Sequence, residues 1–490
     1  MEQSVNNKNK SFKNQLGSGV FYTAIAKYSS IIISLGVTAV LSRLLTPKDF
    51  GIIAVATVFI VFFAIFSDMG IGPAIIQKRN LSEKDYSSLF SFTGYLGVIL
   101  AVIFFFSSWL IADFYKDYRL IPICQILSIN IIFATWNIVP NGLLLKDKKF
   151  KFIGIRTLIV QMALAVASIS AALLGAGVYA LLINPVGSSI LIFILSYWKY
   201  PVKLTLLPKL DAIRKIASYS IYNFGFSLIN YFTRNLDKLL IGKVFNMSEL
   251  GYYEKSYRLM LLPVQNLTHV ITPVLHPVLA DYQDNLQEQA SKYFKLLRFL
   301  TIIGFPLSAF LFFSAKDLIL LIFGSQWLPS VPVFRILSLS VGLQIVGSTT
   351  GSFFQAINRT KQLFIVGVIN TLIMIASLLT GIYVIKSIEG VAWMIVGSFY
   401  LGLWIYVYLA KLSGVNVKCA FDCFLITIMP TLLLSGILWC IYEFVDVSLF
   451  LSLFLKTIPL GVIVFGALQH YKIVNVKSFI NRFYLKLLKR

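Results

Sequence analysis

Residues 230–251 bring apolar and charged side chains together in one short stretch. They read Asn-Tyr-Phe-Thr-Arg-Asn-Leu-Asp-Lys-Leu-Leu-Ile-Gly-Lys-Val-Phe-Asn-Met-Ser-Glu-Leu-Gly. Four of the ionisable side chains fall within ten residues, namely Arg234, Asp237, Lys238 and Lys243. An ionised side chain at the centre of a bilayer costs about 2.5–3.5 kcal/mol on insertion scales. In an apolar chain, such a cluster indicates a wet cavity, an internal ion-pair network or a functional site.

The rest of the chain is apolar. Of its 490 residues, 58% are hydrophobic and only 13% are charged, and the mean hydropathy is +0.82. A soluble domain carries about 25% charged residues. The apolar runs continue for about twenty residues, whereas the strands of a membrane barrel alternate over about ten. The sequence therefore predicts an all-α polytopic membrane protein.

About fourteen transmembrane helices are predicted, with both ends of the chain in the cytoplasm. They cover residues 17–41, 51–76, 87–112, 120–144, 152–175, 177–198, 216–242, 250–279, 296–323, 331–356, 362–385, 390–410, 420–442 and 448–469. With this topology, twenty-eight Lys and Arg residues fall in cytoplasmic segments and seven in outer loops. That bias is the one expected for a multi-pass protein of the inner membrane.

The net charge of +23 follows mostly from these cytoplasmic segments. It requires no nucleic-acid partner, and it favours contact with anionic membrane lipids. The tail 470–490 interleaves basic and apolar residues, which favours a segment lying on the inner leaflet; a partner-binding tail is the alternative.

An internal repeat divides the chain. Leu41-Ser-Arg-Leu-Leu-Thr-Pro-Lys-Asp-Phe-Gly51 and Ile241-Gly-Lys-Val-Phe-Asn-Met-Ser-Glu-Leu-Gly251 align without a gap, each with a base, an acid and a final glycine. Weaker matches follow in the same order, at residues 123–129 with 333–339 and at 155–159 with 369–373. The pattern predicts two six-helix lobes related by an axis along the membrane normal, plus two C-terminal helices, which is a transporter plan.

The predicted domain organisation follows from this repeat. It comprises a cytoplasmic tail (1–16), an N-terminal six-helix lobe (17–198), a basic cytoplasmic linker (199–215), a C-terminal six-helix lobe (216–410), two additional transmembrane helices (411–469) and a basic cytoplasmic tail (470–490).

No pattern typical of an enzyme is present in the sequence. It has neither a nucleotide-binding loop nor a large polar loop, and its three histidines are scattered. Cys419 and Cys423 are four residues apart, but no further Cys or His stands near enough in sequence to complete a metal site. The sequence therefore predicts no enzymatic activity, no cofactor and no metal.

Ionisable residues inside the predicted spans are the candidate site. Arg234 and Arg258 lie at similar distances from the outer loop 243–250, on two helices that form a hairpin. Lys238 and Lys255 add to the bases, and Asp237 and Glu254 are the neighbouring acids. Two interpretations stay open, a basic lining for an anionic substrate and an ion-pair network that staples the hairpin.

Four further ions lie in other spans. Lys27 lies well inside the first span, where it is expected to face the same cavity. Asp68 is either an ion-coupling acid or a hydrated acid at a helix end. Arg156 and Arg335 lie near span ends, and both are expected to extend toward the headgroups.

Several motifs resemble a known family. They are Ser42-Arg-Leu-Leu-Thr-Pro-Lys-Asp-Phe-Gly51, Asp68-Met-Gly-Ile-Gly72, and Asn235-Leu-Asp-Lys-Leu-Leu-Ile-Gly242 followed by Leu250-Gly-Tyr-Tyr253. They are similar to motifs of the polysaccharide transporters, the O-antigen and exopolysaccharide repeat-unit flippases of the multidrug/oligosaccharidyl-lipid/polysaccharide exporter superfamily. The resemblance covers essentially the whole chain.

The resemblance implies a flippase for undecaprenyl-diphosphate-linked oligosaccharides in the bacterial inner membrane, working by alternating access for assembly of O-antigen, capsule or exopolysaccharide. It implies a cationic cavity, carried here by Arg234, Lys238, Arg258 and Lys27. The positions of Asp68, Asp237 and Glu254 in the spans make them the candidate ion-coupling or charge-pair acids. A polysaccharide polymerase is an expected partner. Two alternatives remain, an ion-coupled exporter of drugs or other small molecules on the same fold and a non-transport assembly subunit.

Overall fold

The structure is entirely helical where it is described. The computed structural model describes residues 24–78, 81–206, 234–280 and 285–472, and the single positions 224, 228, 231, 232 and 282. No β-strand occurs among these residues. Contacts divide the chain into two compact units, residues 1–251 and 252–490. The predicted tail 1–16, most of the tail 470–490 and the second half of the linker 199–215 lie outside the described residues.

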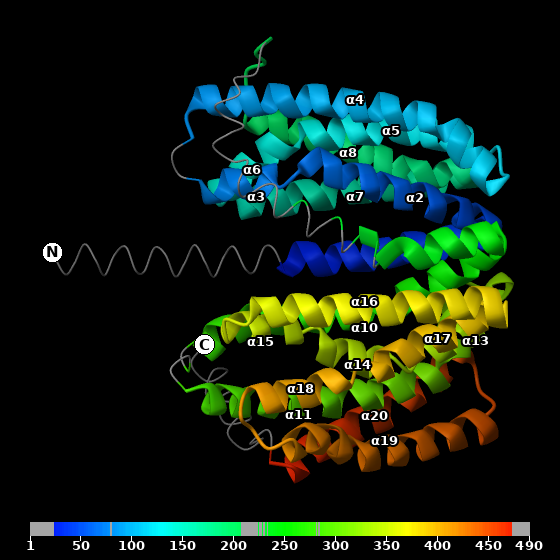
Figure 1. Cartoon of the computed structure of the whole chain (residues 1–490). Helices are drawn as coiled ribbons and strands as arrows, with labels where there is room; N and C mark the ends of the chain where they lie inside the picture. Colours follow the sequence, from blue (N-terminus) through cyan, green and yellow to red (C-terminus); the bar gives the residue numbers. More distant parts are fainter. Residues whose placement is uncertain are drawn as a thin grey trace, which may run out of the picture. The chain divides into compact units, whose positions relative to one another are not determined.

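The first unit is an antiparallel helical bundle. In it α4 packs against α5, α7 packs against α8, and α5 also contacts α2 and α8 (Figure 1). Its elements are a helix at Ala24–Leu44, α2 (Pro47–Asp68), α3 (Ile71–Gln77), α4 (Glu83–Tyr115), α5 (Leu120–Trp136), α6 (Ile138–Lys146), α7 (Phe150–Leu173), the 3-10 turn η1 (Gly177–Tyr179), α8 (Ala180–Lys199) and a helix at 234–244.

Local sequence explains where the helices of this unit begin. Thr46 caps α2 and forms a capping box with Asp49, and Pro47 occupies the first helical position. Ser82 and Asp85 form the same box at the start of α4. Such a cap contributes about 1 kcal/mol, because it satisfies amide groups that have no partner inside the helix. A turn with left-handed Gly175 and Gly177 joins α7 to α8, as the sequence predicts.

The second unit also consists of helices. Its α11 packs against α14, α19 and α20, while α16 packs against α17 and α13. The elements are α10 (Met247–Ala280), α11 (Leu286–Phe313), α12 (Ala315–Ile322), η2 (Ser325–Trp327), α13 (Ser330–Ser338), α14 (Val341–Gly347), α15 (Thr350–Ala356), α16 (Thr360–Thr380), the π-helical η3 (Gly381–Ile385), α17 (Ile388–Leu401), α18 (Trp404–Leu412), α19 (Lys418–Phe444) and α20 (Leu449–His470).

The predicted span 331–356 is broken. Its two parts, Ser330–Ser338 and Val341–Ala356, are bent by 46°. At the break, the amide of Gly342 donates a hydrogen bond to Ser308 Oγ at 2.8 Å. Gly342 also approaches Gly304 of α11 so closely that a Cβ added to Gly304 would lie 2.9 Å from its Cα atom. Ser308 therefore accepts a backbone hydrogen bond at the bend, and the two glycines let α11 and α14 approach closely there.

The chain is a multi-pass membrane protein. Among the described residues, eleven helices are long and apolar enough to cross a membrane, and the bent pair raises the number to as many as twelve. Two of the fourteen predicted spans are not among them. The span 216–242 lies partly outside the described residues, and the span 250–279 falls on α10, which holds several charged residues. The number fourteen stays a prediction.

Tyr231 and the helix at 234–244 pack against other helices of the first unit. Tyr231 donates a hydrogen bond from Oη to the carbonyl oxygen of Val58 on α2, at 3.2 Å. Tyr115, at the end of α4, donates one to the carbonyl oxygen of Leu239, at 3.2 Å. The contact-based division accordingly falls at residue 251, whereas the sequence places a linker at 199–215. The predicted lobe boundaries stay a prediction.

Candidate functional site

The two copies of the sequence repeat meet at the starts of two helices. A Cβ atom added to Gly51 of α2 would overlap the carbonyl oxygen of Met247, and one added to Gly251 of α10 would overlap the carbonyl oxygen of Pro47. The contact is reciprocal, since Pro47 and Met247 are equivalent positions of the repeat, as are the two glycines. Glycine is required at both positions, because any side chain would force the two backbones apart.

The two helix starts are capped at equivalent positions. Thr46 Oγ1 accepts a hydrogen bond from the amide of Asp49, at 3.3 Å, and an Asp49 carboxylate oxygen accepts one from the amide of Thr46, at 3.0 Å. In the second copy, Asn246 Oδ1 accepts a hydrogen bond from the amide of Glu249, at 2.9 Å. The acid and the capping residue of the repeat therefore form helix starts, in addition to any role in transport.

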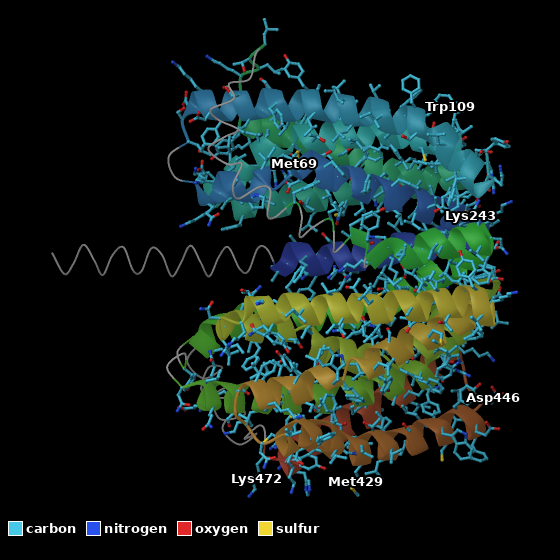
Figure 2. All side chains as sticks on the ribbon, viewed as in Figure 1. Met69, Trp109, Lys243, Met429, Asp446 and Lys472 are labelled. Carbon is cyan, nitrogen blue, oxygen red and sulfur yellow. The ribbon has the colours of Figure 1, made fainter. Side chains whose placement is uncertain are left out.

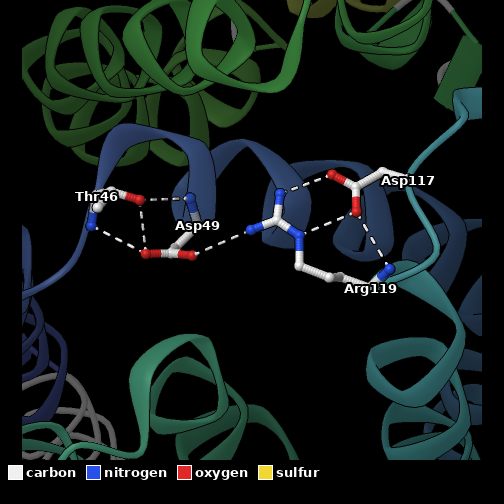
Figure 3. Close-up of polar contacts among 4 residues, drawn as sticks. All are labelled: Thr46, Asp49, Asp117 and Arg119. Atoms are coloured by element: carbon white, nitrogen blue, oxygen red, sulfur yellow. Dashed lines mark hydrogen bonds and ion pairs between the residues drawn. The ribbon is translucent and has the colours of Figure 1, made fainter.

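The loop between α4 and α5 contacts the first copy through a chain of charges. Arg119 lies between two carboxylates, 2.7 Å from Asp117 Oδ2 and 4.0 Å from Asp49 Oδ1 (Figure 3). The Arg119 guanidinium lowers the pKa of Asp117 by hydrogen bonding to its carboxylate. Because the Arg119 side chain is 43% exposed, water weakens this network.

The last turn of α4, just before this loop, contacts the second copy through Lys243. The Lys243 ammonium group donates a hydrogen bond to the carbonyl oxygen of Phe114 and lies 4.2 Å from the centroid of the Phe114 ring. Lys243 lies toward the end of the first unit where α4 finishes and where Trp109 is also labelled, away from Met69 (Figure 2). The segment 113–119, which comprises the end of α4 and the loop after it, thus contacts both repeat copies at one end of the first unit.

The predicted cavity residues of the first unit lie on two helices. Lys27 is half-buried on the helix at Ala24–Leu44. On the helix at 234–244, Arg234 is exposed, Lys238 is half-buried and Asp237 is 1% exposed. The Asp237 carboxylate accepts a hydrogen bond from the amide of Lys238 at 2.8 Å. Substrate binding by these residues stays a prediction.

Asp68 occupies a helix end. It is the last residue of α2, and its carboxylate accepts hydrogen bonds from the amides of Gly70 at 3.2 Å and Gly72 at 3.3 Å. Between them Met69 and Gly70 adopt left-handed backbone angles, so the chain turns sharply into α3. This geometry accounts for the motif Asp68-Met-Gly-Ile-Gly72 as a turn between helices. Coupling by Asp68 stays a prediction.

The predicted site residues of the second unit lie on α10. Glu254 is half-buried and Arg258 is exposed, one helical turn apart. Lys255, which the sequence counts toward a basic lining, is 3% exposed, and its ammonium group lies 5.2 Å from the Phe323 ring and 5.5 Å from the Trp327 ring. The Lys255 side chain packs inside the second unit, so a substrate in a water-filled cavity does not reach it.

Arg156 corrects one expectation from the sequence. It does not extend toward the headgroups, since it is only 5% exposed. Its guanidinium donates hydrogen bonds to Ser196 Oγ of α8 and, at 3.1 Å, to Asn141 Oδ1 of α6. These polar partners on neighbouring helices keep the charge inside the bundle.

One buried ion pair of the second unit was not predicted from the sequence. Lys456 Nζ on α20 lies 2.6 Å from Asp317 Oδ2 at the start of α12, and the same oxygen accepts a hydrogen bond from Ser452 at 2.8 Å. Lys456 also donates to the carbonyl oxygen of Phe313 at 3.3 Å. A lysine in the middle of an apolar span indicates that an acid from another helix pairs with it. The sequence does not show which acid this is, because Asp317 is distant along the chain.

No group of three or more metal-ligating side chains occurs among the described residues. The four cysteines are free.

Known proteins similar to this chain are named for surface polysaccharides. It is 28% identical over 373 residues to the lipopolysaccharide biosynthesis protein WzxC of Escherichia coli (strain K12), covering 74% of each chain. It is 26% identical over 427 residues to the teichuronic acid biosynthesis protein TuaB of Bacillus subtilis (strain 168), covering 82% of this chain and 84% of that one. It is 22% identical to the succinoglycan biosynthesis transport protein ExoT of Rhizobium meliloti (strain 1021), covering 70% of each.

Solved structures share the fold. The lipid II flippase MurJ, in an inward closed conformation, aligns with a TM-score of 0.72 at 15% identity, over 92% of this chain and 99% of that one. An inward-facing multidrug resistance MATE family transporter of the MOP superfamily aligns with a TM-score of 0.62 at 16% identity, over 79% and 96%. The family model described as polysaccharide biosynthesis protein matches residues 40–332, which is more than half of the chain. The chain therefore belongs to the polysaccharide biosynthesis protein family, and the resemblance seen in its motifs is confirmed.

Proposed function

We propose that this protein is a flippase for undecaprenyl-diphosphate-linked oligosaccharide repeat units, serving the assembly of O-antigen, capsule or exopolysaccharide. The observation that carries the proposal is the family match over residues 40–332. The relatives are named for lipopolysaccharide, teichuronic acid and succinoglycan, which are chemically different polymers. A lipid-linked repeat unit is a substrate form that such different polymers can share. A transporter rather than an enzyme is supported by the relative ExoT, named as a transport protein, and by the shared fold with the lipid II flippase MurJ.

The proposed topology places the protein in the bacterial inner membrane with both ends of the chain in the cytoplasm. It has fourteen spans, arranged as two six-helix lobes and two C-terminal helices. The distribution of Lys and Arg supports this orientation. The reciprocal contact of Gly51 and Gly251 supports a relation between the two repeat copies. In this topology, the contact between α2 and α10 at Gly51 and Gly251 lies at the outer end of the first unit. The segment 113–119 lies at the same end.

The proposed substrate site is cationic. Arg234, Lys238, Arg258 and Lys27 supply positive charge for the diphosphate of the lipid carrier, because Arg and Lys bind phosphate groups strongly where water is excluded. Arg234 and Arg258 are exposed on their helices, which suits contact with a passing ligand. Asp68, Asp237 and Glu254 are the acids available for ion coupling or for charge pairing.

The crossing of α2 and α10 suggests how the outer end is kept closed. At Gly51 and Gly251 the two backbones touch, so no water-filled path runs between them at that point. Arg119 lies 4.0 Å from Asp49 near this contact, and because the arginine is 43% exposed this pair contributes little to stability.

The test of the substrate site is a double neutral substitution. Arg234→Gln with Arg258→Gln should abolish surface polymer in a strain that depends on this protein, with membrane expression intact. Arg359→Gln is the matched control, because Arg359 is an exposed arginine at the start of α16 outside the proposed site. Polymer at normal levels in the double variant would refute the binding role of these two residues.

The function itself is tested separately by deleting the gene. Deletion should stop polymer export and leave lipid-linked repeat units on the cytoplasmic side of the membrane. If the units still reach the outer leaflet at the normal rate, the flippase assignment fails, whatever the two arginines do.

A further inference from the structure

Arg335 of the second unit is held by aromatic rings. Its guanidinium carbon lies 5.5 Å from the centroid of the Phe312 ring and 5.5 Å from that of the Tyr442 ring. Among the described residues, its Nε finds no hydrogen-bond partner although that atom is buried. Cation–π contacts attract the guanidinium to the ring faces. They do not satisfy the five N–H donors of a guanidinium.

The neighbouring acid is already neutralised. Asp317 pairs with Lys456 at 2.6 Å, and Lys456 lies 5.6 Å from the Tyr442 ring. Tyr442 therefore has two cations near its ring, and only Lys456 is paired with this carboxylate. The positive charge of Arg335 is left available for a ligand from outside the unit.

The position of Arg335 fits the headgroup layer of a membrane. Tyr442 lies in the last turn of α19, whose 27 residues extend about 40 Å. The hydrocarbon core of a bilayer is about 30 Å thick, so the end of α19 reaches the interface. Tyr442 is 42% exposed and Trp439, one turn earlier, is 51% exposed, as in the aromatic belts that mark this depth.

We propose that Arg335, between Phe312 and Tyr442, binds a phosphate group at this interface, and that a phospholipid supplies it. A guanidinium presents two parallel N–H groups that match two phosphate oxygens. Exposed Tyr442 leaves the site open at the level where lipid phosphates lie. The site is separate from the proposed substrate site, so it does not depend on the flippase assignment.

The proposal is tested by lipid binding to the purified full-length protein. Native mass spectrometry with added phosphatidylglycerol should reveal a tight lipid site whose affinity falls about tenfold in Arg335→Gln. Lys386 is an exposed base directly after η3 of the same unit, and Lys386→Gln should leave that affinity unchanged. Equal affinities for the wild type and Arg335→Gln would overturn the proposal.

Substitutions at Tyr442 keep the test valid if Arg335→Gln fails to fold. Tyr442→Phe retains the ring and should retain the affinity, whereas Tyr442→Leu should weaken it to a similar extent as Arg335→Gln. If Tyr442→Leu binds the lipid as tightly as Tyr442→Phe does, the proposed site between Phe312 and Tyr442 is refuted. If Glu443→Gln causes the same loss as Arg335→Gln, that carboxylate takes part in the site and the proposed arrangement is wrong.

A competition experiment separates the two sources of phosphate. Excess inorganic phosphate should not displace the lipid, because the lipid tails add apolar contacts that the free ion lacks. Displacement by inorganic phosphate at the affinity of the lipid would assign the site to a free anion and overturn the phospholipid assignment.

Discussion

Replacing Lys456 with methionine should strongly destabilise the second unit. Methionine fills a similar volume without a charge, so the substitution leaves Asp317 inside the unit without its cation. The side chains of Lys456 and Asp317 are only 2% and 12% exposed, so water does not substitute for the lost partner. Removing one member of a buried pair typically costs about 3–5 kcal/mol.

The expected loss of stability can be expressed as a fall in the melting temperature, Tm. For a unit of this size, a change of 1 kcal/mol moves the Tm by roughly 2–4 °C, so Lys456→Met should lower it by roughly 6–20 °C. The double variant Lys456→Met with Asp317→Leu should recover most of this loss, because replacing both ions with apolar groups of similar volume is often close to neutral.

Thermal unfolding of the detergent-purified protein, followed by size-exclusion chromatography, measures these differences. Lys472→Met is the control for loss of one charge, because Lys472 is exposed just beyond α20. The reasoning fails if Lys456→Met melts with the wild type, or if the double variant is less stable than either single variant. The first result would mean that the pair is hydrated, and the second that Lys456 and Asp317 act independently.

Three further outcomes follow from the first unit. Gly51→Ala should be less stable than Gly36→Ala by about 1–3 kcal/mol, because an added Cβ at Gly51 overlaps a carbonyl oxygen of α10, whereas one at Gly36 has no atom within 4 Å; equal thermal shifts would contradict the close crossing. Arg119 lowers the pKa of Asp117, so this charged carboxylate stabilises the fold above its unfolded pKa of about 3.9, and the contribution is lost as the pH falls through the folded pKa. Wild type and Asp117→Asn should therefore differ by no more than about 1 kcal/mol at neutral pH and converge in acid, and a difference that grows in acid would reverse the sign. Asp68→Asn keeps only one of the two oxygens that accept bonds from the amides of Gly70 and Gly72, and it should lower transport together with its response to a collapsed proton gradient; an unchanged response would remove the coupling role.

Local sequence patterns predict the helices well. Apolar runs of about twenty residues identify the spans, because backbone groups inside a bilayer must bond within their own segment. The repeat at 41–51 and 241–251 also predicts which two segments are equivalent, and the structure adds that their glycines touch. The bend at 339–340 was not predicted, because its cause is the packing of Gly342 against Gly304 and Ser308, residues more than thirty positions away in the chain.

Charged residues in the spans are harder to interpret from sequence. Lys255 stands beside Glu254 in a charged cluster and Arg156 stands alone, yet Lys255 packs on aromatic rings and Arg156 binds Ser196 and Asn141 from other helices. Asp317 and Lys456 are separated by more than a hundred residues, so no local spacing reveals their pairing. Whether a buried base binds substrate or a neighbouring helix depends on tertiary contacts, which hydropathy does not record.

The reciprocal glycine contact also constrains the parity of membrane crossings. Because α2 and α10 begin side by side, the turns at residues 45–46 and 245–246 lie at the same depth and face the same compartment. The number of crossings between them must then be even. Five apolar spans lie between Pro47 and Lys199. An even number therefore requires the predicted span 216–242 as the sixth crossing. Reporter domains inserted at either turn would report one and the same side of the membrane.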